Sequence, residues 1–141
     1  MSEQNNLEAN KALIRRWFEE VWNNGRAEAI TEMMADECII HGLSEDGQPM
    51  SRDAFFPFHT KFREAFPAID VVVEDAIAEG DKVCARCSVR GKHQGDSLGF
   101  KATGTTAEFD GMGIARVKDG KFVEVWNNFD FMKMYKQLGV M

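Results

Sequence analysis

The sequence predicts an α+β domain in which helices cover one side of an antiparallel sheet. Apolar residues recur with a helical period in residues 7–22 and 52–66, whereas residues 69–129 alternate between apolar and polar positions as strands do. The pair Asp119-Gly120 interrupts this alternation with a strong hairpin signal. These observations place most of the helices in the first half of the chain and most of the sheet in the second.

The first half opens with two helices. The apolar stripe of residues 7–22 predicts a long amphipathic helix, and Gly25 is well placed to end it with a left-handed residue. A short second helix is expected at residues 27–34, followed by a short strand at residues 38–42. The polar segment after that strand is rich in turn-forming residues and indicates a loop.

A third helix is predicted at residues 52–66. Ser51 is suited to be its N-cap, and Asp53 carries negative charge in the first turn, where the helix dipole favours it. Pro57 removes one backbone donor, so we expect it to kink the helix or delay its start. Pro67 marks the end of the helix.

The second half predicts a meander of strands and one last helix. Four strands are expected, at residues 69–79, 82–95, 105–118 and 121–129. A short helix follows at residues 131–138 and ends at Gly139. The first and third helices are rich in aromatic residues, and we expect them to cover the concave face of the curved sheet.

The composition is typical of one globular domain spanning residues 1–141, with 44% hydrophobic and 28% charged residues. The net charge of −6 argues against a nucleic acid partner, because phosphate binding requires clustered Lys and Arg. No apolar run is long enough to span a membrane, so no membrane partner is expected. The polar N-terminal residues lack the apolar core of a signal peptide, so we expect a cytoplasmic protein.

The three cysteines are expected to be free thiols. Cys84 and Cys87 form a C-x-x-C motif, which in other proteins binds zinc or carries out redox chemistry. Here the motif lies in an alternating strand, where side chains three residues apart point to opposite faces. We therefore expect neither a disulfide nor a metal site at this motif.

Strand alternation also indicates which side chains face the core. In residues 82–93, the row of small and apolar residues that ends at His93 is predicted to be buried, and the row of Lys and Arg is predicted to face outward. In residues 121–130 both rows carry apolar groups, and a bulge near Asn127 would exchange them. The sequence therefore does not decide which face of this last strand points inward.

Asp130 is the principal candidate for proton transfer, because it lies among aromatic residues where the last strand gives way to the last helix. Apolar surroundings such as Trp126 and Phe129 raise the pKa of a carboxylic acid and suit it to exchange protons near neutral pH. The simpler alternative is an N-cap of the last helix. The two roles are compatible with each other.

The histidines are weaker candidates. His41 ends the first strand and His93 ends an inward row, so each either contacts a ligand or only stabilises the structure. His59 lies among phenylalanines on the third helix and is interpreted as structural or exposed.

Six segments, in this order and spacing, are characteristic of one protein family: "FEEVWNNGRAEAITEMMADECIIHG" (18–42), "REAFPAID" (63–70), "AEGDKVCARCSVRGKHQG" (78–95), "ATG" (102–104), "DGKFVEVWNNFD" (119–130) and "QLG" (137–139). Through them the chain resembles the SnoaL-like polyketide cyclase group of the NTF2-like superfamily. The resemblance implies a cystatin-like, cone-shaped barrel, in which a curved antiparallel sheet wraps around a long N-terminal helix and opens to a hydrophobic pocket. It also implies a homodimer paired through sheet faces, and no metal or organic cofactor.

The characterised cyclases of this group close a ring by intramolecular aldol condensation. The resemblance therefore implies a small apolar or aromatic carbonyl compound as substrate and, through the spacing W-x-x-x-D, Asp130 as general acid/base. It maps two family histidines onto His93 and His41. The residues expected to contact the substrate are Trp17, Phe62, Phe66, Trp126, Asn128 and Phe129.

Two alternatives keep the same fold. One is a non-catalytic domain that binds a small molecule in the same pocket. The other is a hydrolase, dehydratase or isomerase, and a hydrolase would require carboxylate–arginine pairs inside the pocket. Arg86 and Arg90 lie on the face opposite to His93, which disfavours that option.

Overall fold

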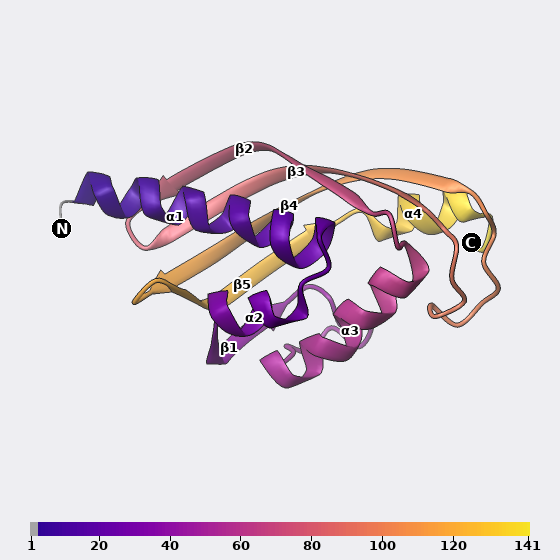
Figure 1. Cartoon of the computed structure of the whole chain (residues 1–141), viewed down its shortest axis with the longest axis horizontal. Helices are drawn as coiled ribbons and strands as arrows, with labels where there is room; N and C mark the ends of the chain where they lie inside the picture. The colour runs from indigo at the N-terminus through magenta and orange to yellow at the C-terminus, as the bar shows by residue number, and fades with distance from the viewer. Residues whose placement is uncertain (1–2) are drawn as a thin grey trace.

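The computed structural model describes residues 3–141. It is a curved five-stranded sheet with helices against one face (Figure 1). The predicted α+β fold class is confirmed. The elements in chain order are α1 (Glu3–Trp17), η1 (Phe18–Asn23, π-helical), α2 (Ala27–Met33), β1 (Met34–His41), α3 (Arg52–Ala65), β2 (Asp70–Glu79), β3 (Lys82–Lys92), β4 (Thr106–Lys118), β5 (Lys121–Phe129) and α4 (Phe131–Leu138). No helix within the described residues is long and apolar enough to cross a membrane.

The strands are ordered β1-β5-β4-β3-β2. Strands β2 to β5 form the predicted antiparallel meander, and Asp119 and Gly120 turn the last hairpin with φ values of 52° and 76°. Strand β1 adds to the free edge of β5 in a parallel arrangement, so the sheet is mixed rather than wholly antiparallel. It is also longer than predicted, because it begins at Met34 directly after α2. Both features arise from the pairing of strands that are distant in the sequence, and local sequence patterns do not encode such pairing.

Strand β5 contains one extra residue relative to β4. Phe122 pairs with Val117 and Glu124 pairs with Arg116, so Val123 has no separate partner and forms a β-bulge. Beyond this bulge the alternation is reversed. Phe122 and then Val125, Asn127 and Phe129 face the helices, as their place in the wall of the internal cavity shows.

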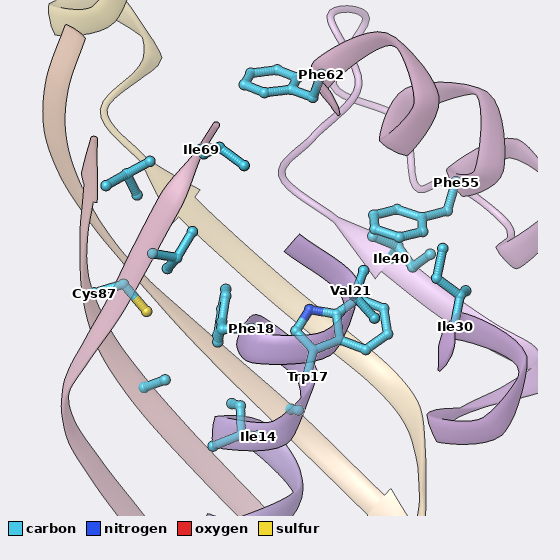
Figure 2. Packing of buried hydrophobic residues seen from close by; sticks show 14 of the residues in the cluster. Ile14, Trp17, Phe18, Val21, Ile30, Ile40, Phe55, Phe62, Ile69 and Cys87 are labelled. Atoms are coloured by element: carbon cyan, nitrogen blue, oxygen red, sulfur yellow. The ribbon is translucent and has the colours of Figure 1, made fainter. Parts of the chain in front are cut away.

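Helix α1 packs across β2 and β3, and α3 lies over β1 (Figure 1). Trp17 lies between the layers, with its ring centroid 5.6 Å from that of Phe55 on α3 and 5.6 Å from that of Phe122 on β5. Figure 2 shows Trp17 and Phe18 between the sheet and the α3 residues Phe55 and Phe62. The two aromatic helices thus cover the concave face, as predicted.

Local signals place the ends of the helices. Ser51 caps α3 by accepting a hydrogen bond from the Ala54 amide at 3.1 Å. Pro57 lies inside α3. The helix nevertheless begins at Arg52, as predicted, and accommodates the missing backbone donor. Gly139, with φ of 77°, ends α4 in the left-handed conformation.

The alternation of β3 is as predicted. Cys87 is buried and Cys84, three residues away, is half-buried on the opposite face. His93 continues the inward row and is fully buried. Burial raises the pKa of the Cys87 thiol to about 12, so this cysteine behaves as a small apolar residue at neutral pH.

A buried histidine supports the π-helical segment η1. His59 on α3 donates from Nε2 to the Val21 carbonyl oxygen at 2.6 Å, and its ring is 5.0 Å from that of Trp22. The end of a helix leaves carbonyl groups without helical partners, and a buried one requires a donor from elsewhere. His59 supplies that donor, and only 3% of its surface is exposed.

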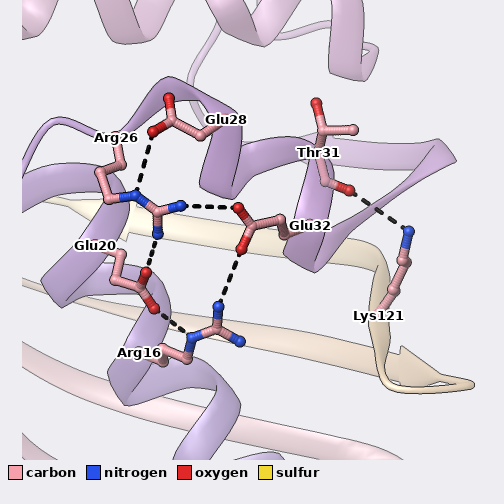
Figure 3. A network of polar contacts seen from close by, with 7 residues as sticks. All are labelled: Arg16, Glu20, Arg26, Glu28, Thr31, Glu32 and Lys121. Atoms are coloured by element: carbon pink, nitrogen blue, oxygen red, sulfur yellow. Dashed lines mark hydrogen bonds and ion pairs between the residues drawn. The ribbon is translucent and has the colours of Figure 1, made fainter.

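A charged network on the surface joins α1, η1 and α2 (Figure 3). Arg26 pairs with Glu20 and with Glu32, the latter at 2.9 Å, and Arg16 pairs with the same two carboxylates. Arg26 also contacts Glu28 at 3.2 Å. Exposed single pairs contribute little to stability, whereas these pairs share partners and connect α1, η1 and α2 in one network.

The buried His59 makes the stability of the fold depend on pH. Burial is the largest cause that lowers its pKa below the ordinary value of 6.5, so the unfolded chain binds a proton more readily than the folded one. Stability is therefore complete above the unfolded pKa and falls as the pH drops below it. We expect denaturant unfolding between pH 7 and pH 5 to show a smaller loss for His59→Gln, whose amide also donates, than for the wild type. Equal losses for the two proteins would contradict this account.

Candidate functional site

An internal cavity lies between the concave face of the sheet and the covering helices. Its enclosed volume is about 80 Å³, and the atom-free space reaches about 770 Å³ only when the open solvent at its mouth is included. Its wall is almost wholly apolar and is formed by Ile14, Trp17, Phe18, Trp22, Met34, Ile40, Leu43, Phe55, Phe58, Phe62, Ile69, Val71, Val89, Phe109, Gly113, Ile114, Ala115, Phe122, Val125, Asn127, Phe129 and Phe131. A concave, mainly aromatic cavity with few polar groups is typical of small-molecule sites.

Among the described residues, Asn127 is the single one in this wall whose side chain carries an amide, hydroxyl or charge. Leu43, Phe58 and Phe131 are among the half-buried residues of the wall. No Asp, Glu, His, Lys or Arg belongs to the wall among the described residues. The side-chain chemistry that the cavity offers to a ligand is therefore apolar contact, the hydrogen bonds of one carboxamide and the indole N–H donors of Trp17 and Trp22.

The strand pairing holds the Asn127 side chain in one orientation. Its Nδ2 donates to the backbone carbonyl of His41 at 3.1 Å, which identifies this atom as the amide nitrogen. Gly42, with φ of 89°, lets the backbone of β1 pass beside the Asn127 carbonyl oxygen, where a Cβ would clash. One N–H of Asn127 and its Oδ1 remain free of this contact.

Space beside Asn127 comes from a glycine on the neighbouring strand. Gly113 pairs with Asn127 across β4 and β5 and is buried. A Cβ on Gly113 would lie 3.6 Å from Asn127 Oδ1, an ordinary van der Waals separation. The missing side chain therefore keeps the volume next to the carboxamide empty.

Three of the residues predicted to contact the substrate lie in the cavity wall: Trp17, Phe62 and Phe129. Phe66 is buried behind the wall, with its ring 5.8 Å from that of Phe62 and 5.5 Å from that of His93.

Trp126, Asn128 and the His41 side chain do not face the cavity. His41 Nε2 lies 2.8 Å from Glu124 Oε2, and its ring stacks on Trp126 with centroids 5.6 Å apart. Glu124 also pairs with Arg116, whose guanidinium lies 5.9 Å from the Trp126 ring centre. These groups form a polar cluster on the outer face of the sheet. The bulge at Val123 is the physical reason, since it turns the row that includes Trp126 and Asn128 outward.

His93 is buried but lies outside the cavity wall. Its Nδ1 accepts from the Thr103 amide at 3.0 Å, and its ring lies against Phe66 and Phe100. The backbone of His93 bonds Thr105 and Gly104 as well. Through Nδ1 and its backbone, His93 anchors the base of the loop between β3 and β4, while its Nε2 is buried and has no hydrogen-bond partner among the described residues.

Asp130 is exposed and is the N-cap of α4. Its Oδ1 accepts from the Lys133 amide at 3.0 Å, and its own amide donates to the Asp110 carbonyl at 3.0 Å. It does not belong to the cavity wall, although the sequence made it the principal candidate for proton transfer. Asp130 directly follows Phe129, which points inward. Because successive side chains along a strand point to opposite faces, the Asp130 carboxylate points outward.

Sequence reasoning overlooked Asn127 as a site residue. The available signal was the spacing of the aromatic residues: Phe122 and Phe129 are seven positions apart, and both face inward only when one extra residue intervenes. With that bulge, Asn127 shares the inward row with Val125 and Phe129.

Comparison with known proteins identifies relatives over nearly the whole chain. The family of SnoaL-like polyketide cyclases matches residues 12–138. The aklanonic acid methyl ester cyclase DauD of Streptomyces sp. (strain C5) is 28% identical over 129 residues, which are 90% of this chain and 80% of DauD. The crystal structure of IdmH from Streptomyces antibioticus, described as a putative polyketide cyclase, has a TM-score of 0.78 and 30% identity over 92% of this chain and 99% of IdmH. A SnoaL-like protein from Jannaschia sp. CCS1 shares the fold, with a TM-score of 0.87 and 22% identity. The match covers 100% of this chain and 99% of the Jannaschia protein.

The capping role of Asp130 predicts a stability effect that depends on the acceptor and not on the charge. Asp130→Ala removes the acceptor for the Lys133 amide and should lower the free energy of unfolding by about 1 kcal/mol. Asp130→Asn keeps an acceptor and should cost clearly less. Urea unfolding of both variants measures the difference, and equal effects would argue against the cap.

Proposed function

Since this chain belongs to the SnoaL-like polyketide cyclase family, we propose that it is a cyclase-type enzyme that acts on a small, largely apolar carbonyl compound bound in the aromatic cavity. The single observation that carries the proposal is the cavity itself, whose wall is aromatic or aliphatic except for one carboxamide. Similarity to DauD and IdmH supports a polyketide as the class of substrate.

Ring closure by an aldol reaction suits such a cavity. A proton leaves a carbon that lies between carbonyl groups, the resulting enolate carbon forms a bond to a second carbonyl carbon, and the new alkoxide takes up a proton. The substrate already carries the activating carbonyls. The main contribution of the protein is then to hold the chain folded with the two carbons close together and to keep water away.

Trp17, Phe62 and Phe129 are suited to hold a flat substrate. Trp17 reaches into the space between the sheet and α3, as Figure 2 shows, and Phe129 contacts Phe18 and Phe131 at centroid distances of 6.3 Å each. Offset and edge-to-face contacts at such distances stabilise an aromatic ligand beyond the area that it buries. These three residues are the proposed substrate contacts from the sequence-based set.

The general acid/base role that the W-x-x-x-D spacing suggests for Asp130 stays a prediction and is not needed for the proposed function. An exposed carboxylate at the start of α4 reaches the substrate only where the reacting carbons extend beyond Phe129 to the rim of the cavity. The geometry favours the capping role. His93 and His41 are engaged with Thr103 and Glu124 and do not line the wall.

A non-catalytic binding domain is the second candidate function, and one observation favours it. The described part of the cavity wall contains no side chain that exchanges protons near neutral pH. Such a protein would bind the same class of compound and release it unchanged. A homodimer paired through the outer face of the sheet fits either function, and the exposed Ile39 and Met112 on that face support it.

Filling the cavity beside Asn127 tests the proposed function. Gly113→Leu places a side chain in the empty space and should reduce the cyclisation of aklanonic acid methyl ester at least 100-fold, while Gly113→Ala, at 3.6 Å from Asn127 Oδ1, should stay near the wild type. Product formation is followed by chromatography, and thermal unfolding confirms that both variants fold. Full turnover by Gly113→Leu would refute the cavity as the site, and binding without turnover in the wild type would support the carrier function.

Replacing the charge of Asp130 separates its two possible roles. Asp130→Asn keeps the cap but has no proton to exchange, and from the exposed position of this residue we expect turnover within about twofold of the wild type. The measurement is the rate of ring closure at saturating substrate. A loss of 100-fold or more with unchanged unfolding would instead establish Asp130 as the general acid/base.

A further inference from the structure

Among the described residues of the cavity wall, Asn127 is the one whose side chain both donates and accepts hydrogen bonds, whereas the indole N–H groups of Trp17 and Trp22 can only donate. Every other side chain of the wall offers apolar contact, apart from the indole N–H groups of Trp17 and Trp22. An apolar wall binds flat molecules with little preference for their orientation. A carboxamide in such a wall therefore decides which edge of the ligand faces it.

The orientation of this carboxamide is set from outside the cavity. Nδ2 donates one hydrogen to the His41 carbonyl at 3.1 Å, and Gly42 allows the two backbones to approach closely enough for that bond. The amide cannot turn over without placing Oδ1 against the His41 carbonyl oxygen. Oδ1 and the second N–H therefore keep fixed positions beside the space left by Gly113.

We propose, as an extension of the proposed function, that Asn127 is the positioning residue of the cavity and selects a neutral carbonyl group of the ligand. The free N–H donates to a ligand ketone or enolate oxygen, and Oδ1 accepts from a neighbouring hydroxyl group. A carboxamide does not exchange protons near neutral pH, so Asn127 orients the ligand and polarises its carbonyl rather than acting as a base.

The surroundings of Asn127 restrict the ligand to neutral groups at this position. The described cavity wall contains no Lys, Arg or His that would offset a buried carboxylate, and no Asp or Glu that would offset a buried cation. A charge taken out of water without a partner is strongly disfavoured. A ligand carboxylate must therefore point through the mouth, and the ligand part at Asn127 is a ketone, ester or hydroxyl.

Two ligands of equal size test the inference. Isothermal titration calorimetry compares 2-acetylnaphthalene, which has a carbonyl, with 2-ethylnaphthalene, which has none. Asn127→Leu, similar in size but apolar, should weaken 2-acetylnaphthalene about five- to tenfold, the loss of one hydrogen bond, and leave 2-ethylnaphthalene within about twofold. For the wild type, 2-naphthoate should bind at least tenfold more weakly than 2-acetylnaphthalene.

The unchanged affinity for 2-ethylnaphthalene guards against a merely structural effect, because both Asn127→Leu and a second variant, Asn127→Asp, lose the hydrogen bond to the His41 carbonyl. Asn127→Asp keeps the shape of the side chain but brings a carboxylate towards the ligand carbonyl, so it should weaken 2-acetylnaphthalene more than Asn127→Leu does. Thermal unfolding of both variants is measured alongside. Equal losses for the acetyl and ethyl ligands, or no loss, would overturn the role of Asn127 while leaving the cavity as a binding site. No binding of either ligand by the wild type would overturn the proposed function and this inference together.

Discussion

One extra residue in β5 determines which side chains face the interior. Without the bulge at Val123, the inward row that begins at Phe122 would continue through Glu124 and Trp126. A carboxylate and an indole would then point into the core, and the cavity would be both smaller and charged. With the bulge, Val125, Asn127 and Phe129 take the inward positions, and the ionisable groups of this strand stay outside. The apolar character of the cavity depends on this single irregularity.

The same strand joins the two sides of the sheet. Glu124 accepts contacts from His41 and Arg116 on the outer face, while Asn127 holds the His41 carbonyl from within. The parallel pairing of β1 with β5 thus has side-chain support on both faces. Gly42 is required at this junction, because any larger residue would push β1 away from the Asn127 backbone. The orientation of the Asn127 carboxamide follows from the pairing of the edge strand.

Several polar residues that sequence motifs single out serve the architecture. His59 satisfies the carbonyl of Val21, His93 anchors the loop before Thr105, and Asp130 caps α4. Each of them meets the requirement that a buried or terminal backbone group finds a hydrogen-bond partner. The chemistry in reach of a ligand is left to the aromatic wall and Asn127. A cavity of this kind favours reactions in which the substrate carries its own activating groups.

The sequence by itself determined the helices, four of the five strands within a few residues, the hairpin at Asp119-Gly120, the cap at Ser51 and the inward row of β3. These features depend on periods of 3.6 and 2.0 residues and on local turn chemistry, which short segments encode. Only the tertiary structure decided the parallel pairing of β1, the bulge at Val123 and, through them, that Asn127 rather than Trp126 or Asp130 meets the cavity. Register between distant strands arises from how the whole core packs, and a shift of one residue exchanges the two faces of a strand.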